Sequence, residues 1–127
     1  MILKNCTFFN ENFEKEYGDI ENGKIKQIGI LDGDGKDMAG KIIIPGFIDV
    51  HIHGCAGGDA SDADKSGLEK MAKELAKHGV TSFCPTSMTL PKERLESIVK
   101  AIKEFKEENH GGAKVMGINL EGPFIAM

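Results

Sequence analysis

The sequence predicts an α/β fold built on parallel strands, and three features of the chain indicate it. Residues 44–54, 80–84 and 114–121 are apolar runs of strand length. Two stretches with the periodicity of amphipathic helices separate these runs, so strand and helix alternate. Repeated βαβ units of this kind place their strands in parallel through right-handed crossovers. Residues 1–44 lack the alternation, and we therefore expect two regions that meet near residue 45.

Residues 1–44 are expected to form short strands joined by turns. Asn22-Gly23 lies between two strand-like runs and predicts a hairpin, because a type I′ turn needs positive φ at both central positions. The expected strands are Ile2–Leu3 with Cys6–Phe9 as the first, Tyr17–Ile20 as the second and Lys24–Ile30 as the third.

Asp32-Gly33 and Asp34-Gly35 predict two tight turns. The same stretch is similar to the start of an EF-hand loop, which begins Asp-x-Asp-x-Asp-Gly. However, Lys36 stands at the third ligand position, and Ile43 stands at the twelfth, where a bidentate Glu is required. We therefore expect turns and no calcium site in this stretch.

The stretch Ile44–Gly54 carries the residues best suited to chemistry. Alternation along a strand places Asp49, His51 and His53 on one face, while the apolar residues suit a strand that is covered on both faces. Two imidazoles two residues apart can approach one ion together, and imidazole is a common ligand of Zn, Fe, Ni and Cu. The alternative is a pair of half-buried histidines held by hydrogen bonds. Gly54 is expected to end the strand and open a Gly-rich loop.

Two amphipathic helices are expected between the apolar strands. The first begins near Ser61 and Asp64, which have capping-box spacing, and closes at His78-Gly79. The second begins near Pro91, which is tolerated in a first turn, and ends at Asn109–Gly112. The expected buried stripes are Leu68, Met71, Ala72, Leu75 and Ala76 in the first helix, and Leu95, Ile98, Val99, Ile102 and Phe105 in the second.

The second apolar strand, Val80–Cys84, is expected to stop before Pro85. Cys84 is interpreted as a buried apolar thiol, because no cationic neighbour in the sequence would make it reactive. The hydroxyl-rich stretch Thr86–Thr89 is expected to be a loop with capping side chains, since no G-x-S-x-G motif supports a serine nucleophile.

Glu121 stands at the end of the third apolar strand. Burying an unpaired carboxylate is costly, so this residue calls for a cation, hydrogen-bond donors or a metal, unless it is simply exposed at the strand end. Parallel strands bring their carboxyl ends to one edge, where chemistry gathers in such folds. We therefore expect His51, His53 and Glu121 to converge, with Cys84 at the matching end of the middle strand.

The composition excludes several classes of function. A formal net charge of -4 gives no support for nucleic-acid binding, and no GxGxxG or GxxxxGK[ST] motif supports nucleotide binding. Neither a signal peptide nor a membrane span is expected, because no basic-then-apolar leader and no apolar run of about 18 residues occurs. Cys6, Cys55 and Cys84 are odd in number and far apart, which fits reduced thiols and a cytoplasmic location.

The number of strands bears on the completeness of the fold. A (β/α)₈ barrel takes about 250 residues, and three parallel strands cannot close one. A three-stranded sheet would leave long apolar edges bare. We therefore expect the 127 residues to be part of a longer protein.

Three stretches resemble signatures of the metal-dependent amidohydrolase superfamily. Pro45–Gly54 matches its P-G-F-I-D-x-H-x-H-G pattern. Within that superfamily, Gly79–Thr86 and Leu120–Ile125 are similar to the N-acetylglucosamine-6-phosphate deacetylase family. The resemblance runs along the whole chain but covers only about the first third of a typical family member.

The resemblance implies a fold and a reaction. Residues 1–44 would be the N-terminal part of a small β-sandwich domain, and residues 45–127 the first three βα units of an incomplete TIM barrel. Glu121 would bind the main catalytic metal, Zn or Fe, while His51 and His53 match positions that hold a second metal in some members. The implied reaction is hydrolysis of the acetamide of N-acetylglucosamine 6-phosphate by metal-activated water, which yields acetate and glucosamine 6-phosphate.

The rest of the family's site is expected beyond Met127. It comprises later metal-binding histidines, the catalytic Asp and the residues that contact phosphate and sugar, so no catalytic residue is expected within the chain. The 127 residues alone are therefore expected to be inactive. The whole enzyme is expected to be a cytoplasmic homodimer of amino sugar metabolism, with a small amino-sugar phosphate as its partner and no nucleic acid or membrane.

Two other functions are compatible with parts of the sequence. The first is another amidohydrolase, such as a dihydroorotase or a deaminase. The stretch Leu120–Phe124 argues against it, because those enzymes commonly place a carboxylated Lys or other ligands where the deacetylases use Glu. The second is a non-catalytic metal-binding or assembly module, which would bind metal without hydrolysis.

Overall fold

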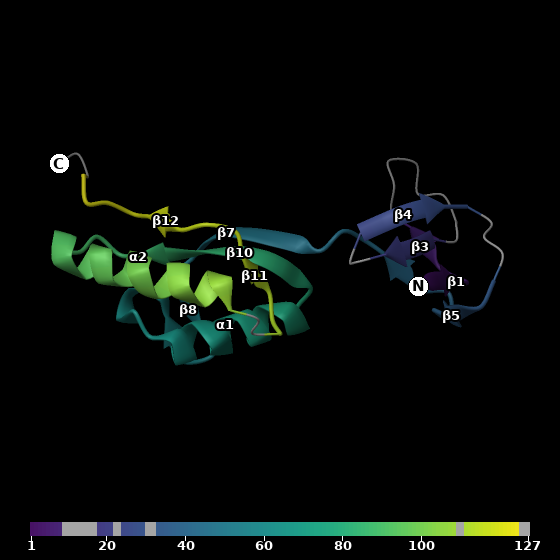
Figure 1. Cartoon of the computed structure of the whole chain (residues 1–127), viewed down its shortest axis with the longest axis horizontal. Coiled ribbons are helices and arrows are strands. Elements are labelled where there is room, and N and C mark those ends of the chain that lie inside the picture. The colour runs from purple at the N-terminus through teal and green to yellow at the C-terminus, as the bar shows by residue number, and fades with distance from the viewer. Residues whose placement is uncertain (9–17, 22–23, 30–32, 109–110, 125–127) are drawn as a thin grey trace. The chain divides into compact units, whose positions relative to one another are not determined.

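The structure of the chain is a computed structural model that describes residues 1–8, 18–21, 24–29, 33–108 and 111–124. The chain divides into two compact units, Met1–Pro45 and Gly46–Met127 (Figure 1). Within the described ranges, no helix combines the length and the apolar character needed to cross a membrane.

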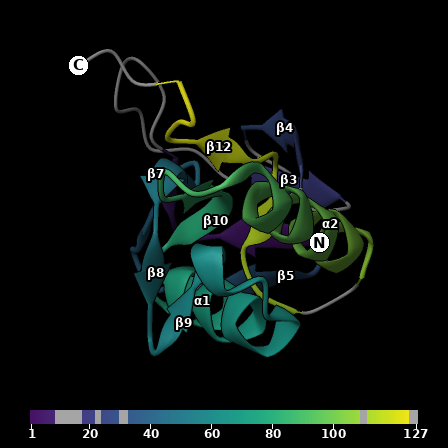
Figure 2. The same cartoon turned by 90° about the vertical axis from the view of Figure 1, so that its left-hand side faces the viewer.

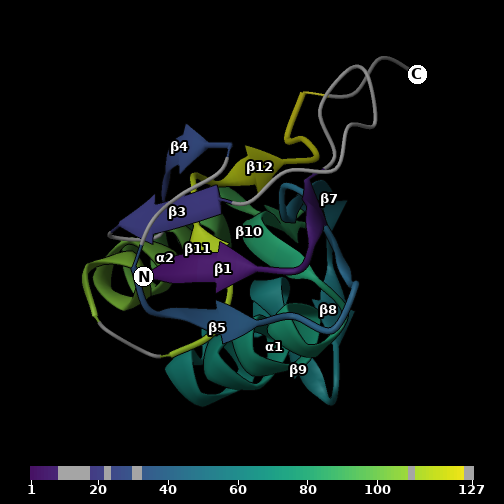
Figure 3. The same cartoon turned by 90° about the vertical axis from the view of Figure 1, so that its right-hand side faces the viewer.

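The first unit is a small sheet of short strands with its own core (Figure 3). Its four-stranded sheet has the order β4 (Lys24–Ile28), β3 (Gly18–Glu21), β1 (Ile2–Lys4), β5 (Gly35–Asp37). β1 pairs antiparallel with β3 and parallel with β5. A separate parallel pair consists of β2 (Thr7–Phe8) and β6 (Ile42–Ile43). The core consists of Leu3, Cys6 and Phe8, with Met38 and Ile43 packed against them.

The predicted strands of this unit are found with different bounds. β3 and β4 pair antiparallel as the hairpin prediction requires, while the turn Asn22-Gly23 lies outside the described residues. The single strand expected from Ile2 to Phe9 is wrong. Asn5 has a φ of 52° and its side-chain amide donates to Asp37 Oδ1 at 3.0 Å, so the chain bends there and divides into β1 and β2.

The turn expected at Asp34-Gly35 is also wrong, because Gly35 begins β5. A Cβ on Gly35 would lie 2.8 Å from the carbonyl oxygen of Ile2, so the close pairing of β5 with β1 requires glycine. In the other predicted turn, Asp32 lies outside the described residues.

The second unit has the predicted α/β class. Its elements in chain order are β7 (Phe47–Ile52), β8 (Gly54–Cys55), β9 (Gly58–Asp59), the 3-10 helix η1 (Ala60–Asp62), α1 (Lys65–Lys77), β10 (Val80–Ser87), α2 (Lys92–Glu107), β11 (Lys114–Val115) and β12 (Asn119–Leu120). β10 is the central strand, and it pairs in parallel with β7, β11 and β12. Both helices lie against the same face of the sheet (Figure 2).

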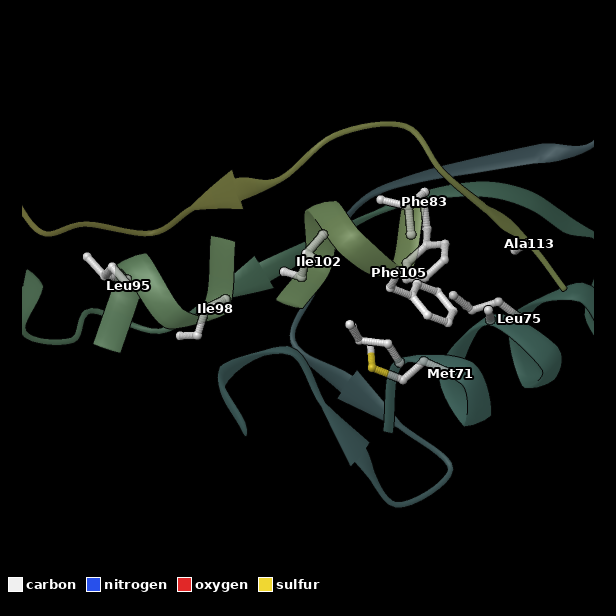
Figure 4. Packing of buried hydrophobic residues seen from close by; sticks show 11 residues of the cluster. Met71, Leu75, Phe83, Leu95, Ile98, Ile102, Phe105 and Ala113 are labelled. Atoms are coloured by element: carbon white, nitrogen blue, oxygen red, sulfur yellow. The ribbon is translucent and has the colours of Figure 1, made fainter. Parts of the chain in front are cut away.

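The hydrophobic core of this unit lies between β10 and the two helices. Phe83 of β10 is fully buried, and Met71 of α1 and Phe105 of α2 belong to the same cluster (Figure 4). The predicted helix stripes are buried except at Ala76 and Val99, which are exposed at the margins of the contact. Burial of these apolar side chains is the main stabilisation available to the unit.

The prediction that β7 is covered on both faces is wrong for the described residues. Phe47, Ile48 and Val50 are 58%, 57% and 64% exposed. The helices pack on β10 rather than on β7, and within the described ranges β7 pairs with β10 alone. The apolar composition of β7 therefore predicted a strand correctly but not its surroundings.

The N-terminus of α1 is capped by Asp64, not by Ser61 as the capping-box spacing suggested. The Asp64 carboxylate accepts the backbone N–H groups of Ser66 and Gly67, both at 3.1 Å. The Ser66 hydroxyl also donates to this carboxylate. Its bond is the main cause, and the backbone N–H bonds a further cause, of a pKa of Asp64 below the usual value. Ser61 lies in η1, and its hydroxyl accepts the N–H of Met88 instead. The predicted end of the helix at His78-Gly79 is confirmed.

β10 is longer than predicted, because it continues through Pro85 to Ser87. Proline cannot donate to a ladder, and Pro85 lies where the ladder to the third strand is interrupted. β11 pairs with Ser82 and Phe83, whereas β12 pairs with Thr86 and Ser87.

The third strand, predicted as one run from Lys114 to Glu121, is therefore two short strands. Between the paired residues Val115 and Asn119 the third strand holds one residue more than β10 holds between Phe83 and Thr86. This extra residue is a bulge, which interrupts regular pairing.

The segment after His53 is a small hairpin rather than the open Gly-rich loop predicted to start at Gly54. β8 and β9 pair antiparallel, and the turn residues Ala56 and Gly57 have φ values of 50° and 77°, as a type I′ turn requires. The hairpin packs on α1 so closely that a Cβ on Gly58 would lie 2.2 Å from the carbonyl oxygen of Gly67 (Figure 2).

Replacement of Ile98 by Ala should destabilise the chain by about 2–5 kcal/mol, because Ile98 is fully buried in the core and its loss leaves a cavity. Val99→Ala, one residue further along α2, is the matched control. Val99 is exposed, so the Val99→Ala substitution should change the free energy of unfolding of the chain by less than about 0.5 kcal/mol. Urea unfolding followed by circular dichroism measures both, and equal effects of the two variants would contradict the assigned core.

Candidate metal centre

Three potential metal ligands from two strands meet at the carboxyl ends of β7 and β12. His51 lies near the end of β7, His53 follows that strand, and Glu121 follows β12. The Nε2 atoms of His51 and His53 are 3.3 Å apart. Glu121 Oε2 lies 3.4 Å from His51 Nε2 and 2.9 Å from His53 Nε2. In the part of the chain that the structure describes, this is the one group of three His, Cys, Asp or Glu side chains close enough to hold an ion.

The end of β7 turns both imidazoles toward the same point. The two rings meet edge to face, with centroids 5.1 Å apart and an interplanar angle of 71°. Asp49, which the alternation placed on the same face, has a different role: its Oδ1 accepts the backbone N–H of His51 at 3.1 Å. Asp49 thus binds the backbone of its own strand and is not part of the ligand group.

Thr86 of β10 holds the ring of His53. His53 Nδ1 lies 3.1 Å from the Thr86 carbonyl oxygen, and because a carbonyl can only accept, Nδ1 carries the proton. In the neutral ring Nε2 then presents a lone pair to the centre. A backbone carbonyl that receives the outer N–H of a histidine is a typical second partner in metal sites. Thr86 was predicted to be a loop residue, and this is wrong: it is fully buried within β10.

Glu121 is held through its backbone. Its N–H donates to the carbonyl oxygen of Ser87 at 3.4 Å, which continues the pairing of β12 with β10. The hydroxyl of Thr89 donates to the Glu121 carbonyl oxygen at 2.6 Å. These two contacts fix the start of the side chain at the end of the strand and leave the carboxylate to face the histidines.

The donor atoms of the group suit a cation. A neutral His53 presents a lone pair at Nε2, and the Glu121 carboxylate at 2.9 Å can only accept. A bound cation would satisfy both acceptors and the nearby Nε2 of His51. The side chains of His51, His53 and Glu121 are 52%, 35% and 46% exposed, so an ion could reach them from solvent.

The spacing of the three atoms fits ligation of one ion. Zn–N bonds of 2.0–2.1 Å in a tetrahedral site place neighbouring ligand atoms about 3.3 Å apart. The observed separations of 3.3, 3.4 and 2.9 Å lie close to this value. Two imidazoles and a carboxylate are a donor set that zinc and iron accept.

Other candidate residues lie outside the centre. Cys84, expected at the matching end of the middle strand, lies two residues before Thr86 and takes no part in the ligand group. Burial raises the pKa of the Cys55 thiol, which makes it a poorer ligand and nucleophile. His78 Nε2 lies 3.1 Å from the Glu74 carboxylate, and both side chains are at the surface near the end of α1. His110 lies outside the described residues.

Comparison with known proteins identifies related sequences along the whole chain. The profile described as "Amidohydrolase family" matches residues 42–127. Human N-acetylglucosamine-6-phosphate deacetylase is 46% identical over 94 residues, which are 72% of this chain and 23% of that protein. The enzyme of the same name from Lysinibacillus sphaericus is 34% identical over 132 residues, with 99% of this chain and 34% of that protein covered.

Solved structures give the same result. N-acetylglucosamine-6-phosphate deacetylase from Pasteurella multocida has a TM-score of 0.85 at 26% identity over 98% of this chain and 35% of that chain. The Thermotoga maritima structure has a TM-score of 0.79 at 29% identity over 99% of this chain and 33% of that chain. The chain thus spans about a quarter to a third of the proteins it matches.

With Zn²⁺ bound, His53 should be in the neutral form that is protonated at Nδ1, because the Thr86 carbonyl accepts that proton and ligation would keep a proton off Nε2. Long-range ¹H–¹⁵N correlation spectra, at a pH where the rings are neutral, distinguish the two tautomers. His78 is the internal control: its Nε2 faces the Glu74 carboxylate and should carry the proton. Protonation of His53 at Nε2 would contradict the geometry.

Proposed function

The chain belongs to the amidohydrolase family, and from this membership we propose that it forms the metal-binding first part of an N-acetylglucosamine-6-phosphate deacetylase. The reaction would hydrolyse the acetamide of N-acetylglucosamine 6-phosphate to acetate and glucosamine 6-phosphate. The names of the human and Lysinibacillus sphaericus relatives support this substrate. On this proposal residues 1–44 belong to a small β-sandwich, and residues 45–127 supply the first three βα units of a TIM barrel.

The single observation that carries the proposal is the approach of Glu121 Oε2 to within 2.9 and 3.4 Å of two imidazole Nε2 atoms. Lone-pair donors gathered at this distance are most simply explained as ligands of a divalent ion. We propose His51, His53 and Glu121 as metal ligands, with Zn or Fe as the ion. A non-catalytic metal-binding module would share these ligands but would not explain the similarity to deacetylases along the chain.

The chain's own residues would prepare the centre for hydrolysis. A divalent ion bound there lowers the pKa of water to about 7 and polarises a carbonyl oxygen. His51 and His53 offer neutral nitrogens, and Glu121 offers the negative charge that offsets part of the charge of the ion. The Thr86 carbonyl keeps the His53 proton on Nδ1, away from the ligand position. No group that could act as general acid or base is proposed among these residues, and the catalytic Asp of the family is expected elsewhere in the whole enzyme.

The setting of the whole enzyme is part of the same proposal. Its partner would be a small amino-sugar phosphate, and its place would be in the cytoplasm, in amino sugar metabolism. We expect the whole enzyme to be a homodimer that requires neither nucleic acid nor a membrane. Size-exclusion chromatography with light scattering of a full-length relative measures the oligomeric state.

Metal binding should depend on the three proposed ligands. The chain should bind Zn²⁺ with a stabilisation of about 2.7 kcal/mol when free Zn²⁺ is at 100 times its Kd, and EDTA should remove this gain. Glu121→Gln and His53→Ala should each abolish most of it, whereas His78→Ala, which removes a surface imidazole, should leave it unchanged. Thermal unfolding with and without Zn²⁺ measures the effect. A gain that survives Glu121→Gln would place the ion elsewhere.

Deacetylation is tested in a chimera in which residues 1–127 replace the matching third of the Lysinibacillus sphaericus relative. With Zn²⁺ or Fe²⁺ the chimera should release acetate from N-acetylglucosamine 6-phosphate, and the 127-residue chain alone should not. Glu121→Gln should lower the deacetylase activity of the chimera by more than the roughly 10–100-fold loss caused by removing an outer-shell partner of a metal ligand. His78→Ala is the control.

A folded chimera without deacetylase activity would argue against the assigned substrate. Hydrolysis of dihydroorotate, or deamination of a nucleobase, by the same protein would then favour another amidohydrolase. Tight metal binding without any hydrolysis would favour the non-catalytic module.

A further inference from the structure

The pairing of β7 with β10 is irregular next to the candidate metal centre. Asp49 pairs with Phe83, and Ile52 pairs with Pro85. Between these partners β7 holds two residues, Val50 and His51, whereas β10 holds only Cys84. β7 therefore carries one extra residue at this point, and His51 lies within the bulge. Bulges of this kind bend a strand and re-aim the side chains that follow it.

Two side chains bind backbone N–H groups of the bulged segment. Asp49 Oδ1 accepts the N–H of His51, and Thr86 Oγ1 accepts the N–H of Ile52, both at 3.1 Å. The Thr86 hydroxyl also donates to the carbonyl oxygen of Cys84 at 3.2 Å. The hydroxyl thus bridges β7 and β10 at the bulge.

The same residue reaches the ring of His53 through its backbone. The Thr86 carbonyl oxygen lies 3.1 Å from His53 Nδ1, so one buried residue holds both the amide that precedes His53 and its imidazole. A shift of β7 against β10 would break both contacts together. The aim of His53 Nε2 toward Glu121 therefore depends on the position of Thr86.

The geometry points to Thr86 as a positioning residue for the candidate metal centre: its hydroxyl holds the end of β7 in place, and its carbonyl orients His53. This inference rests on the proposed metal-binding function. Thr86 contacts neither the ion position nor any reacting atom, so it acts only through Ile52 and His53.

Titration of the metal-free chain with Co²⁺, followed by its visible d–d absorption and by competition with Zn²⁺, tests this role. Thr86→Val keeps the shape and the backbone carbonyl but removes the hydroxyl. It should weaken binding by about 10–100-fold, the usual cost of losing an outer-shell partner, and should alter the Co²⁺ spectrum. Thr86→Ser restores the hydroxyl and should restore both the affinity and the spectrum.

Thr81→Val is the matched control. Thr81 also lies in β10, and its hydroxyl donates to the carbonyl oxygen of Phe47 at the other end of β7, at 3.5 Å. Its replacement removes a contact between the same two strands away from the centre, so the Co²⁺ affinity and spectrum should not change. Circular dichroism and thermal unfolding of the metal-free variants separate loss of fold from loss of positioning.

The outcomes are distinct. A folded Thr86→Val chain with wild-type affinity and spectrum overturns the inference, as does an equal loss of affinity in Thr81→Val. If Thr86→Val does not fold, Thr86→Ala is measured in the same way, and loss of fold in both variants assigns Thr86 a purely structural role. If the wild-type chain binds neither Co²⁺ nor Zn²⁺, the proposed metal centre itself fails, and the inference fails with it.

Discussion

The parallel pairing of β7 with β10 is the interaction on which the second unit depends. It sets the height of His51 and His53 relative to Thr86, and β10 in turn carries Phe83 into the core. Because side chains alternate across a strand, a register slip of one residue would turn the histidines to the opposite face. β12 joins the same strand on its own register and brings Glu121 to the histidines. The candidate centre is thus a product of two strands, β7 and β12, aligned on the central strand β10.

Much of this architecture could be predicted from the sequence because the decisive patterns are local. Helical periodicity located α1 and α2, and three apolar runs located the strand positions. The rule that parallel strands gather their carboxyl ends at one edge then led from His51, His53 and Glu121 to a common site. One ligand atom of each of these three side chains lies within 4.8 Å of the other two, and their role as ligands stays a prediction.

The details that escaped prediction depend on neighbours distant in the sequence. Pro85 is tolerated inside β10 only because the third strand is interrupted beside it, and no local pattern announces that interruption. Thr86 was predicted to be a loop residue for the same reason, because it directly follows Pro85. Asp64 and Ser61 both suit a helix cap, and the structure decides between them: Asp64 accepts the first N–H groups of α1, while Ser61 bonds Met88 instead. The exposure of β7 depends on which elements pack against this strand, and its amino-acid composition does not predict those neighbours.

The β8–β9 hairpin has a consequence for how the site could open and close. Enzymes often place a mobile flap in the loop that follows a catalytic strand. Here the hairpin is anchored instead: Gly58 touches the backbone of Gly67 in α1, and the His53 carbonyl accepts the N–H of Ala60 at 2.7 Å. Movement of this segment would have to break both the close Gly58–Gly67 packing and the hydrogen bond from Ala60 to His53. The segment that directly follows the ligand-bearing strand is therefore expected to keep its place when an ion binds.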